Sequence, residues 1–132
     1  METIELNVDT STKKIVDITS QCQNFSNSKQ NGLLNVFVPH ATAGLAIIET
    51  GSGSEQDLIV LIDNLLPKTS SYTHRHGSMG HGRDHILPAL ISPSMTVPVI
   101  NGSLVLGTWQ SIVVVDTNVD NPHRKVILSF LS

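Results

Sequence analysis

Cysteine is almost absent from this chain, which has one residue of this type, Cys22, among 132. A single thiol cannot form an internal disulfide, so nothing in the sequence indicates an oxidising compartment. No apolar run approaches the roughly 20 residues that are needed to cross a bilayer. The first segment, METIELNVDTSTKK, also lacks the basic-then-apolar order of a secretory signal. We therefore expect a cytoplasmic protein that has no membrane partner.

Positive charge is scarce as well. The chain has 8 Lys and Arg residues against 11 Asp and Glu residues, which gives a formal net charge of -3. This balance argues against nucleic acid as a partner, because binding to the phosphate backbone requires a basic face. The remaining composition, 39% hydrophobic and 14% charged, is that of an ordinary globular chain. We expect one domain over residues 1–132, which would bury about two-thirds of the surface of the unfolded chain.

Apolar residues alternate with polar ones in several short segments, and this period of two predicts β-strands. The dipeptide Asn101-Gly102 is the strongest turn signal in the chain and predicts a hairpin. We expect GLAIIE to pair with the strand that precedes it. The predicted strands are TIELNV, GLLNVFVPH, GLAIIE, the two arms of the hairpin in TVPVINGSLVLGTWQSIVVVD, and VILSFL.

One segment, SEQDLIVLIDNLL, predicts a helix. Ser54 is placed to cap it, Asp57 follows three residues later as a first-turn acid, and Pro67 ends it. Its expected apolar face consists of Leu58, Leu61, Ile62 and Leu65. The sequence therefore predicts an α+β protein. It would have a mainly antiparallel, sandwich-like β-sheet, one long amphipathic helix and short helices.

Four of the six histidines lie within YTHRHGSMGHGRDH, residues 72–85. His74 and His76 would face the same side of an extended segment, and His81 and His85 have the spacing of one helical face. The glycines on both sides of His81 oppose a helix there. Neutral imidazole is a common zinc ligand, yet this spacing matches no specific zinc motif. A metal site and a solvated polar loop both remain open.

Other polar residues follow or end predicted strands. His40 stands after a rigid proline, and Thr42 with Gly44 offers a hydroxyl group and open backbone that suit an oxyanion. His40 is equally explained as a structural residue. Glu49 is either a general base or metal ligand, or simply the polar end of its strand. Cys22 has no basic neighbour that would lower its pKa, so we do not expect a thiol nucleophile.

The segment LVLGTWQSI is the most distinctive in the chain. Trp109 could belong to the core, and Gln110 would then face the other way, where its amide could bind substrate or a neighbouring subunit. The segment resembles the signature of the YjbQ-like family, also called the secondary thiamine-phosphate synthase family. Motifs along nearly the whole chain agree in order with this family: Pro39, His40, Thr42 and Ala43; LAIIE ending at Glu49; Tyr72 with His74; His85; and Pro98 and Gly102.

The resemblance implies a sandwich-like α+β subunit, a homotrimer and a histidine-lined site for a divalent metal. It also implies a secondary thiamine-phosphate synthase activity, which joins hydroxymethylpyrimidine diphosphate to thiazole phosphate with loss of pyrophosphate. The chain departs from the family at His81, where asparagine or aspartate is usual. Imidazole ligands favour zinc, whereas magnesium, the alternative, prefers oxygen.

These considerations give a set of expected site residues. We expect the metal ligands to be His40, His74 and His85, with His76 and His81 as outer or alternative ligands. Glu49 is the expected catalytic acid or base. The expected contacts to a small phosphorylated substrate are Thr42, Gln110 and Arg124. The alternative to an enzyme is a non-catalytic trimeric module that binds a metal or a small phosphorylated metabolite.

Overall fold

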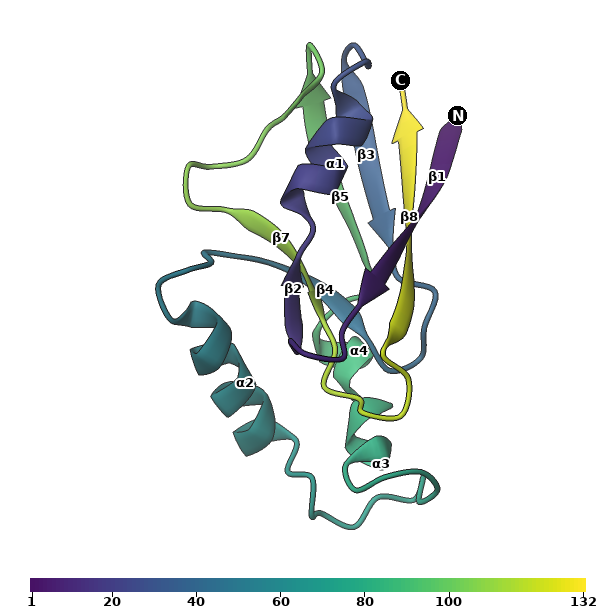
Figure 1. Ribbon diagram of the computed structural model, residues 1–132, viewed down its shortest axis with the longest axis vertical. Coiled ribbons are helices and arrows are strands. Elements are labelled where there is room, and N and C mark those ends of the chain that lie inside the picture. Colours follow the sequence, from purple (N-terminus) through teal and green to yellow (C-terminus); the bar gives the residue numbers. More distant parts are fainter.

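Two antiparallel β-sheets form the body of the protein in the computed structural model, which describes residues 1–132 (Figure 1). The larger sheet has five strands in the order β1-β8-β3-β5-β6, and the smaller has three in the order β2-β7-β4. The larger sheet consists of β1 (Glu2–Asp9), β8 (His123–Leu131), β3 (Gly32–Phe37), β5 (Ser94–Ile100) and β6 (Ser103–Leu104). The smaller consists of β2 (Ile15–Asp17), β7 (Ser111–Val115) and β4 (Gly44–Ile48). The predicted α+β, mainly antiparallel architecture is confirmed.

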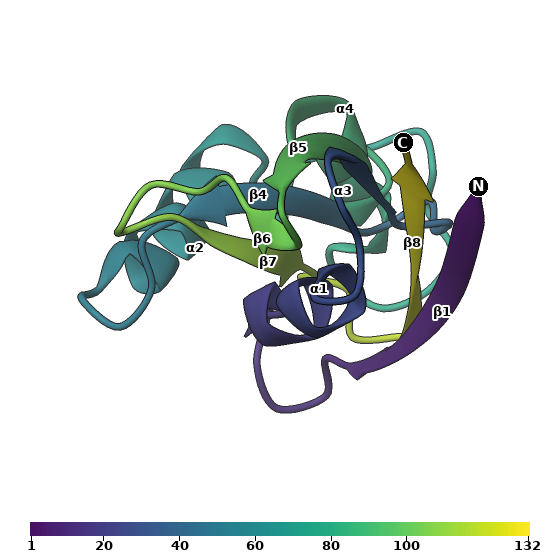
Figure 2. The ribbon, with the colours of Figure 1, turned by 90° about the horizontal axis from the view of Figure 1, so that it is seen from above.

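The main apolar core lies between the two sheets. Along β8, Val126, Leu128 and Phe130 are buried in alternation with residues that are not, as expected for a strand with one face in a core. Residues of the smaller sheet, including Ile112 and Val114, pack against them. Seen from above, β1 and β8 lie on one side of the molecule and helix α2 on the other (Figure 2).

Helix α1 (Thr19–Ser26) adds Cys22 to this core. Its thiol is fully buried, and desolvation raises its pKa from 9.0 to about 12. The thiol is therefore protonated and inaccessible at neutral pH, as expected for a structural cysteine rather than a nucleophile.

The hairpin predicted at Asn101-Gly102 is confirmed. Ile100 pairs with Ser103, so only these two residues form the turn. Both have positive φ angles, 49° for Asn101 and 80° for Gly102. A two-residue turn of this kind matches the right-handed twist of the strands, and asparagine and glycine tolerate the left-handed backbone that it requires.

Strand β4 does not pair with β3, as the sequence had suggested, but with β7. Strand β3 lies between β8 and β5 in the larger sheet. The chain between β3 and β4 crosses from one sheet to the other, held by hydrogen bonds from Val38 N to Pro93 O and from Leu45 N to Ser92 O, both 2.8 Å long. Hydrophobic alternation marks a strand but does not specify its neighbour, which explains the error.

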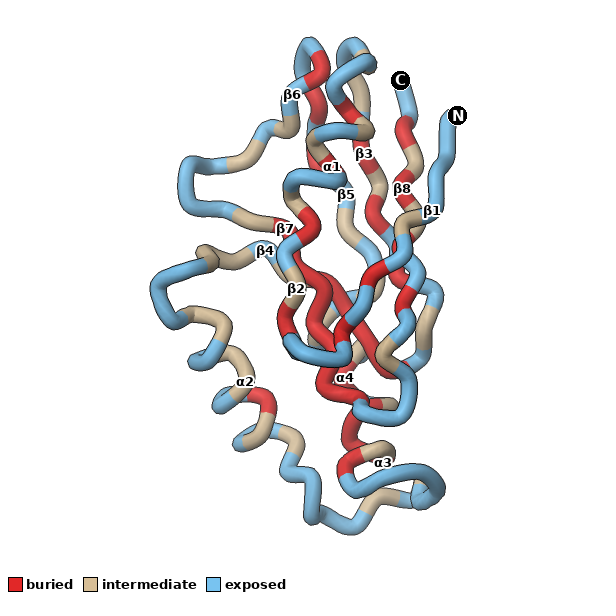
Figure 3. The backbone as a smooth tube through the Cα atoms, viewed as in Figure 1, coloured by how far each residue is buried: buried red, intermediate tan, exposed pale blue.

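Helix α2 (Ser54–Leu65) forms where predicted, but a long helix with the expected apolar face is not found. It spans 12 residues, and Leu61 and Leu65 are 51% and 60% exposed. Only Ile62 is buried, and most of α2 is coloured exposed or intermediate in Figure 3. The residues that pack on the second, smaller core are Leu58, Ile59, Ile62 and Leu66. The buried face is therefore rotated from the expected one, because the helix rests with one side on the outer face of the smaller sheet.

The start of α2 also differs from the expected cap. The N-cap residue is Gly53, whose φ angle is 102°, and it has no side-chain cap. Glu55, rather than Asp57, reaches back, and its carboxylate accepts a hydrogen bond from Gly51 N at 3.1 Å. No helix of this structure combines the length and the apolar character that crossing a membrane requires.

The GTWQ segment is a turn that precedes β7 and is not part of a strand. Gln110 N donates to Gly107 O at 3.1 Å, and Gly107 N donates to the Gln110 Oε1 atom at 2.7 Å. Trp109 is 72% exposed, so its interpretation as a core residue is wrong for this chain.

Candidate metal centre

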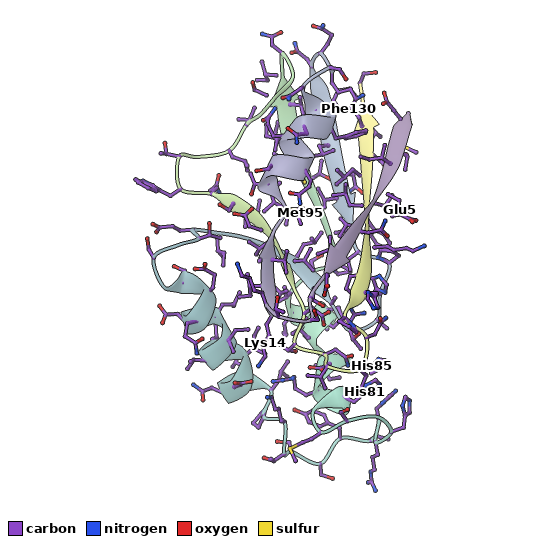
Figure 4. The ribbon with its side chains drawn as sticks, viewed as in Figure 1. Glu5, Lys14, His81, His85, Met95 and Phe130 are labelled. Carbon is purple, nitrogen blue, oxygen red and sulfur yellow. The ribbon has the colours of Figure 1, made fainter.

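Three histidine side chains converge at the end of the molecule where the short helix α3 (His81–Asp84) lies. His74 comes from the loop before α3, His81 is its first residue, and His85 follows it directly. One nitrogen atom from each ring lies within 4.8 Å of the other two. The Nε2 atoms of His81 and His85 are 3.1 Å apart, and Figure 4 shows the two residues side by side. The His74 and His85 rings have centroids 4.0 Å apart.

Two glycines allow this convergence, although they had argued against a helix. Gly80 lies just before α3 and has a φ angle of 88°, which a glycine adopts without strain. A Cβ atom at Gly82 would lie 2.3 Å from His74 O and 2.8 Å from the Tyr72 Cβ atom. The His74 loop can therefore cross over α3 only because position 82 has no side chain. The helical turn then places His81 and His85 on one face.

A buried polar network holds α3 in place. The Arg83 guanidinium donates to the Asp84 carboxylate at 2.8 Å and to the Asp63 carboxylate of α2 at 2.9 Å. Asp84 also accepts hydrogen bonds from the Thr117 hydroxyl at 2.6 Å and from the Asn118 amide at 3.1 Å. Helix α3 is thereby fixed both to α2 and to the loop between β7 and β8.

On its outer side, His81 contacts Asp120 of the same β7–β8 loop. The His81 Nδ1 atom and the Asp120 Oδ2 atom are 2.7 Å apart. The Asp120 carboxylate accepts further hydrogen bonds from the hydroxyl and the backbone N–H of Ser78. The hydroxyl bond is the largest cause that lowers the pKa of Asp120 below its usual value.

The donor atoms of this cluster fit a zinc-like cation. The Nδ1 atom of His74 is buried and has no hydrogen-bond partner in the protein, an arrangement that a metal bond would satisfy. Desolvation first, and then the neighbouring imidazoles, lowers the pKa of both His74 and His85. Both rings are therefore neutral at pH 7, the form that binds metals. Tetrahedral zinc with Zn–N bonds of about 2.0–2.1 Å places its nitrogen ligands about 3.4 Å apart, close to the 3.1 Å between the Nε2 atoms of His81 and His85.

A polar cavity of about 350 Å³ adjoins the cluster and is lined by two of its rings, those of His74 and His81. Lys68, Arg75 and Ser78 line it together with His76. The exposed His76 ring has its centroid 4.0 Å from that of His74 and 4.9 Å from that of His81. Two cationic side chains and a hydroxyl group beside a metal site are suited to an anion with several oxygen atoms.

His40, expected as a metal ligand, is not part of this cluster. Its Nε2 atom accepts a hydrogen bond from Lys125 N at 2.9 Å, so this nitrogen is already used within the chain. Desolvation, with a smaller contribution from the Arg124 guanidinium, lowers the pKa of His40. Of the three expected ligands, the structure brings together His74 and His85 and adds His81 in place of His40.

Arg124 and Thr42, expected to contact substrate, lie close together but are buried. The Arg124 guanidinium donates to the Asp116 carboxylate at 2.6 and 3.0 Å and to the Thr42 hydroxyl at 2.7 Å. Asp116 thus neutralises the charge of Arg124 within the chain.

Glu49, the expected acid or base, lies far from the histidines of the same chain. Strand β4 begins opposite Val115, the residue from which the chain leads into the loop of Asp120. Glu49 follows β4 at its other end, roughly 16 Å further along at about 3.3 Å per residue. Gln110 lies at this same far end, and its side chain is bonded to Gly107. A single chain therefore brings neither residue to the cluster.

Sequence reasoning assigned no role to the segment DTNVDN, residues 116–121, although it supplies the contacts behind α3. The Asn118 Oδ1 atom accepts hydrogen bonds from Asp120 N at 2.9 Å and Asn121 N at 3.1 Å. A dense run of Asp and Asn directly after a buried strand is typical of turns in which side chains bond to the backbone. This pattern could have identified the segment as an ordered turn.

Comparisons with known proteins agree with the motifs found in the sequence. Residues 2–132 match the model of the family described as UPF0047 protein YjbQ-like. The UPF0047 protein Rv2556c of Mycobacterium tuberculosis is 57% identical over 131 residues, which cover 99% of this chain and 98% of the relative. A UPF0047 protein of Methanothermobacter thermautotrophicus is 37% identical, with 95% and 87% covered.

Two solved structures are similar over almost their whole length. A hypothetical protein from Aeropyrum pernix K1 superposes with a TM-score of 0.89 at 32% identity, covering 100% of this chain and 99% of that one. A protein from Sulfolobus solfataricus P2, described as YbjQ-like and of unknown function, gives a TM-score of 0.91 at 25% identity and covers 99% and 96%. The chain therefore belongs to the YjbQ-like UPF0047 family.

Proposed function

We propose that this protein is a metal-dependent enzyme that acts on a small phosphorylated substrate. His74, His81 and His85 would hold a divalent transition metal, with zinc the best match to three imidazole donors. The observation that supports this most directly is the convergence of these rings, together with the buried and unpaired Nδ1 atom of His74. Three protein ligands leave a coordination position open, which is the arrangement of catalytic rather than structural zinc sites.

The cavity beside the rings supports a phosphorylated substrate. Lys68 and Arg75 line it, and their charged groups can donate hydrogen bonds to phosphate oxygens. In this proposal they take the role that the sequence suggested for Arg124, whose guanidinium is engaged by Asp116. A volume of about 350 Å³ is within the range of small-molecule sites.

For the reaction itself, we propose thiamine-phosphate formation. The thiazole nitrogen would use its lone pair to form a bond with the methylene carbon of hydroxymethylpyrimidine diphosphate. The carbon–oxygen bond would break, and pyrophosphate would leave with that electron pair. A divalent cation bound at the cluster would stabilise the charge that develops on the departing group. Lys68 and Arg75 would bind and orient its oxygens. The step transfers no proton, so it requires no carboxylate at the histidines.

The alternative is a non-catalytic module that binds a metal or a phosphorylated metabolite, and one observation favours it over any enzyme whose reaction depends on proton transfer. Glu49, the carboxylate that could act as general acid or base, lies at the far end of β4 from the cluster of its own chain. A reaction that depends on proton transfer would lack this group, whereas binding alone would not require it.

Removal of the metal is expected to separate these two functions. Chelator-treated protein should form no thiamine phosphate from the two substrates, and adding back one equivalent of Zn²⁺ should restore the product, measured by mass spectrometry. A metal-loaded protein that binds hydroxymethylpyrimidine diphosphate in calorimetry but forms no product would support the binding module. Full activity after complete metal removal would contradict the metal-dependent proposal.

We also propose that the protein assembles as a homotrimer, as the family resemblance implies. Leu33 of β3 pairs with Leu131 of β8, and both side chains are exposed on the outer face of the larger sheet together with Phe37. Such an apolar face is suited to contact with another subunit. Light scattering should give about 43 kDa, three times the 14.3 kDa chain. A mass of about 14 kDa at micromolar concentration would contradict the trimer.

A further inference from the structure

Asp120 connects two parts of the histidine loop from outside the metal cluster. Its Oδ2 atom lies 2.7 Å from the Nδ1 atom of His81 and 3.1 Å from Ser78 N. Its Oδ1 atom accepts the hydrogen bond of the Ser78 hydroxyl. The residue belongs to the β7–β8 loop, 39 positions along the chain from His81, so these bonds attach the histidine loop to the sheet framework.

The contact determines which nitrogen of His81 carries the proton. A carboxylate only accepts hydrogen bonds, so the Nδ1 atom must be the donor and must be protonated. The Nε2 atom of the neutral ring is then free of a proton, and it points at the Nε2 atom of His85, 3.1 Å away. The Nε2 atoms are thus the ones that face the site.

A second neighbour could have imposed the opposite arrangement. The Asn118 Nδ2 atom lies 3.2 Å from the same Nδ1 atom. The orientation of this amide is fixed, because its oxygen accepts from Asp120 N and Asn121 N. Its NH₂ group therefore faces His81 as a donor, and one of its two hydrogens binds the Asp84 Oδ2 atom at 3.1 Å. The other could bind Nδ1 only if that atom had no proton. The shorter contact with the charged Asp120 carboxylate, 2.7 Å, outweighs it and sets the protonation of the ring.

The packing around Asp120 shows that space is reserved for this bond. A Cβ atom at Gly77 would lie 2.9 Å from the Asp120 Oδ2 atom and 2.5 Å from the Cγ atom of His81. Gly77 also has a φ angle of 85°, a backbone conformation that glycine adopts readily. A residue with a side chain there would push the carboxylate and the imidazole apart.

We propose that Asp120 is a positioning residue that holds His81 as the Nδ1-protonated tautomer, with its Nε2 atom directed into the metal site before a metal binds. This inference rests on the proposed metal centre for its functional meaning. Histidines that bind metals commonly donate their other ring N–H to a carboxylate, which fixes the ring and raises its basicity. Loss of such a partner typically weakens metal binding by about 10–100-fold.

The first measurement uses metal-free protein, so it does not depend on metal binding. In the wild type, ¹⁵N NMR of the imidazoles is expected to show His81 protonated at Nδ1. In Asp120→Ala, His81 loses the carboxylate, and the Asn118 NH₂ group, 3.2 Å from its Nδ1 atom, would donate to that atom, so the proton is expected to move to Nε2. An unchanged tautomer in Asp120→Ala would overturn the proposal, because a residue that only supports the loop would not control the proton.

The second measurement is zinc affinity in competition with a chelator. Asp120→Ala is expected to bind about 10–100-fold more weakly than the wild type. Asp57→Ala, which removes an exposed carboxylate from α2, serves as the matched control and is expected to keep wild-type affinity. Ser78→Ala should retain the His81 tautomer, which separates the Asp120–His81 bond from anchoring of the loop. Affinity within twofold of the wild type in Asp120→Ala would contradict the inference.

The two proposals fail in different ways. If the wild-type protein binds no zinc, the metal centre is wrong, while the tautomer of His81 in the metal-free protein still tests the role of Asp120. If the wild type binds zinc and Asp120→Ala binds it equally well, the metal centre stands and the positioning role falls. Circular dichroism of each variant confirms that the comparison is made between folded proteins.

Discussion

Replacing His81 by alanine is expected to remove bound zinc from this protein, whereas replacing His40 by alanine is expected to leave its zinc content unchanged. His81 contributes one of the three nitrogen atoms that lie within 4.8 Å of one another. His40 lies outside this group, and its Nε2 atom is already bonded to Lys125 N. The pair of variants therefore compares the ligands given by the structure with those suggested by the sequence.

The expected size of the effect follows from ligand count. Loss of a partner that only orients a ligand weakens zinc binding by about 10–100-fold, so loss of a ligand itself should exceed about a hundredfold. Elemental analysis after gel filtration should find close to one zinc per chain in His40→Ala and almost none in His81→Ala. His123→Ala, which alters an exposed histidine of β8, is the matched control and should retain the metal.

The reverse result would be equally informative. Zinc retained in His81→Ala and lost in His40→Ala would support the set His40, His74 and His85, and would require a contact that a single chain does not make. Loss of zinc in both variants, with each still folded by circular dichroism, would mean that zinc binding depends on His40 as well as on His81. The cluster of His74, His81 and His85 would then be an incomplete description of the site.

His81 was not predicted as one of the three metal ligands, although part of the evidence for it lies in the local sequence. The spacing of four between His81 and His85 was visible, but the flanking glycines argued against a helical turn. In the structure Gly80 stands outside the turn and Gly82 makes room for the His74 loop. Both glycines therefore serve the arrangement they had seemed to exclude. The family resemblance also led away from His81, because asparagine or aspartate is usual there.

The sequence predicted the fold more completely than the site, for a physical reason. Strands, the hairpin and the position of α2 depend on alternation, turn residues and proline, which act over a few residues. The neighbour of β4 and the buried face of α2 depend instead on which distant segments pack together. The contact between Asp120 and His81 has the same non-local character, so a pattern within either segment could not reveal it.

Arg124 illustrates that an arginine in a sequence can be read either as a substrate contact or as part of a buried structural ion pair. The family resemblance suggested Arg124 as a contact to a phosphorylated substrate. In the structure its side chain is 2% exposed and forms a bidentate ion pair with Asp116. A buried guanidinium with its own carboxylate is primarily part of the folded framework, and its loss should appear in stability rather than in substrate affinity.

Asp116→Asn is therefore expected to lower the free energy of unfolding by about 3–5 kcal/mol, because it leaves the charge of Arg124 buried without a counter-charge. The substituted carboxylate also accepts hydrogen bonds from the Thr10 hydroxyl at 2.6 Å and from Asn118 N at 3.0 Å. The change keeps the size of the side chain, so it creates no cavity. Against a typical stability of about 5–15 kcal/mol, the loss would be a large fraction of the total.

Urea unfolding of the metal-free protein, followed by circular dichroism, measures this loss. Lys125→Ala is the matched control: it breaks the solvent-exposed pair with Glu5, whose atoms are 3.2 Å apart, and should cost less than about 1 kcal/mol. Combining Asp116→Asn with Arg124→Met should recover part of the stability, because the unpaired charge is then removed as well. A loss below about 1 kcal/mol in Asp116→Asn would show that Arg124 does not depend on Asp116, and would return its guanidinium to the candidates for substrate binding.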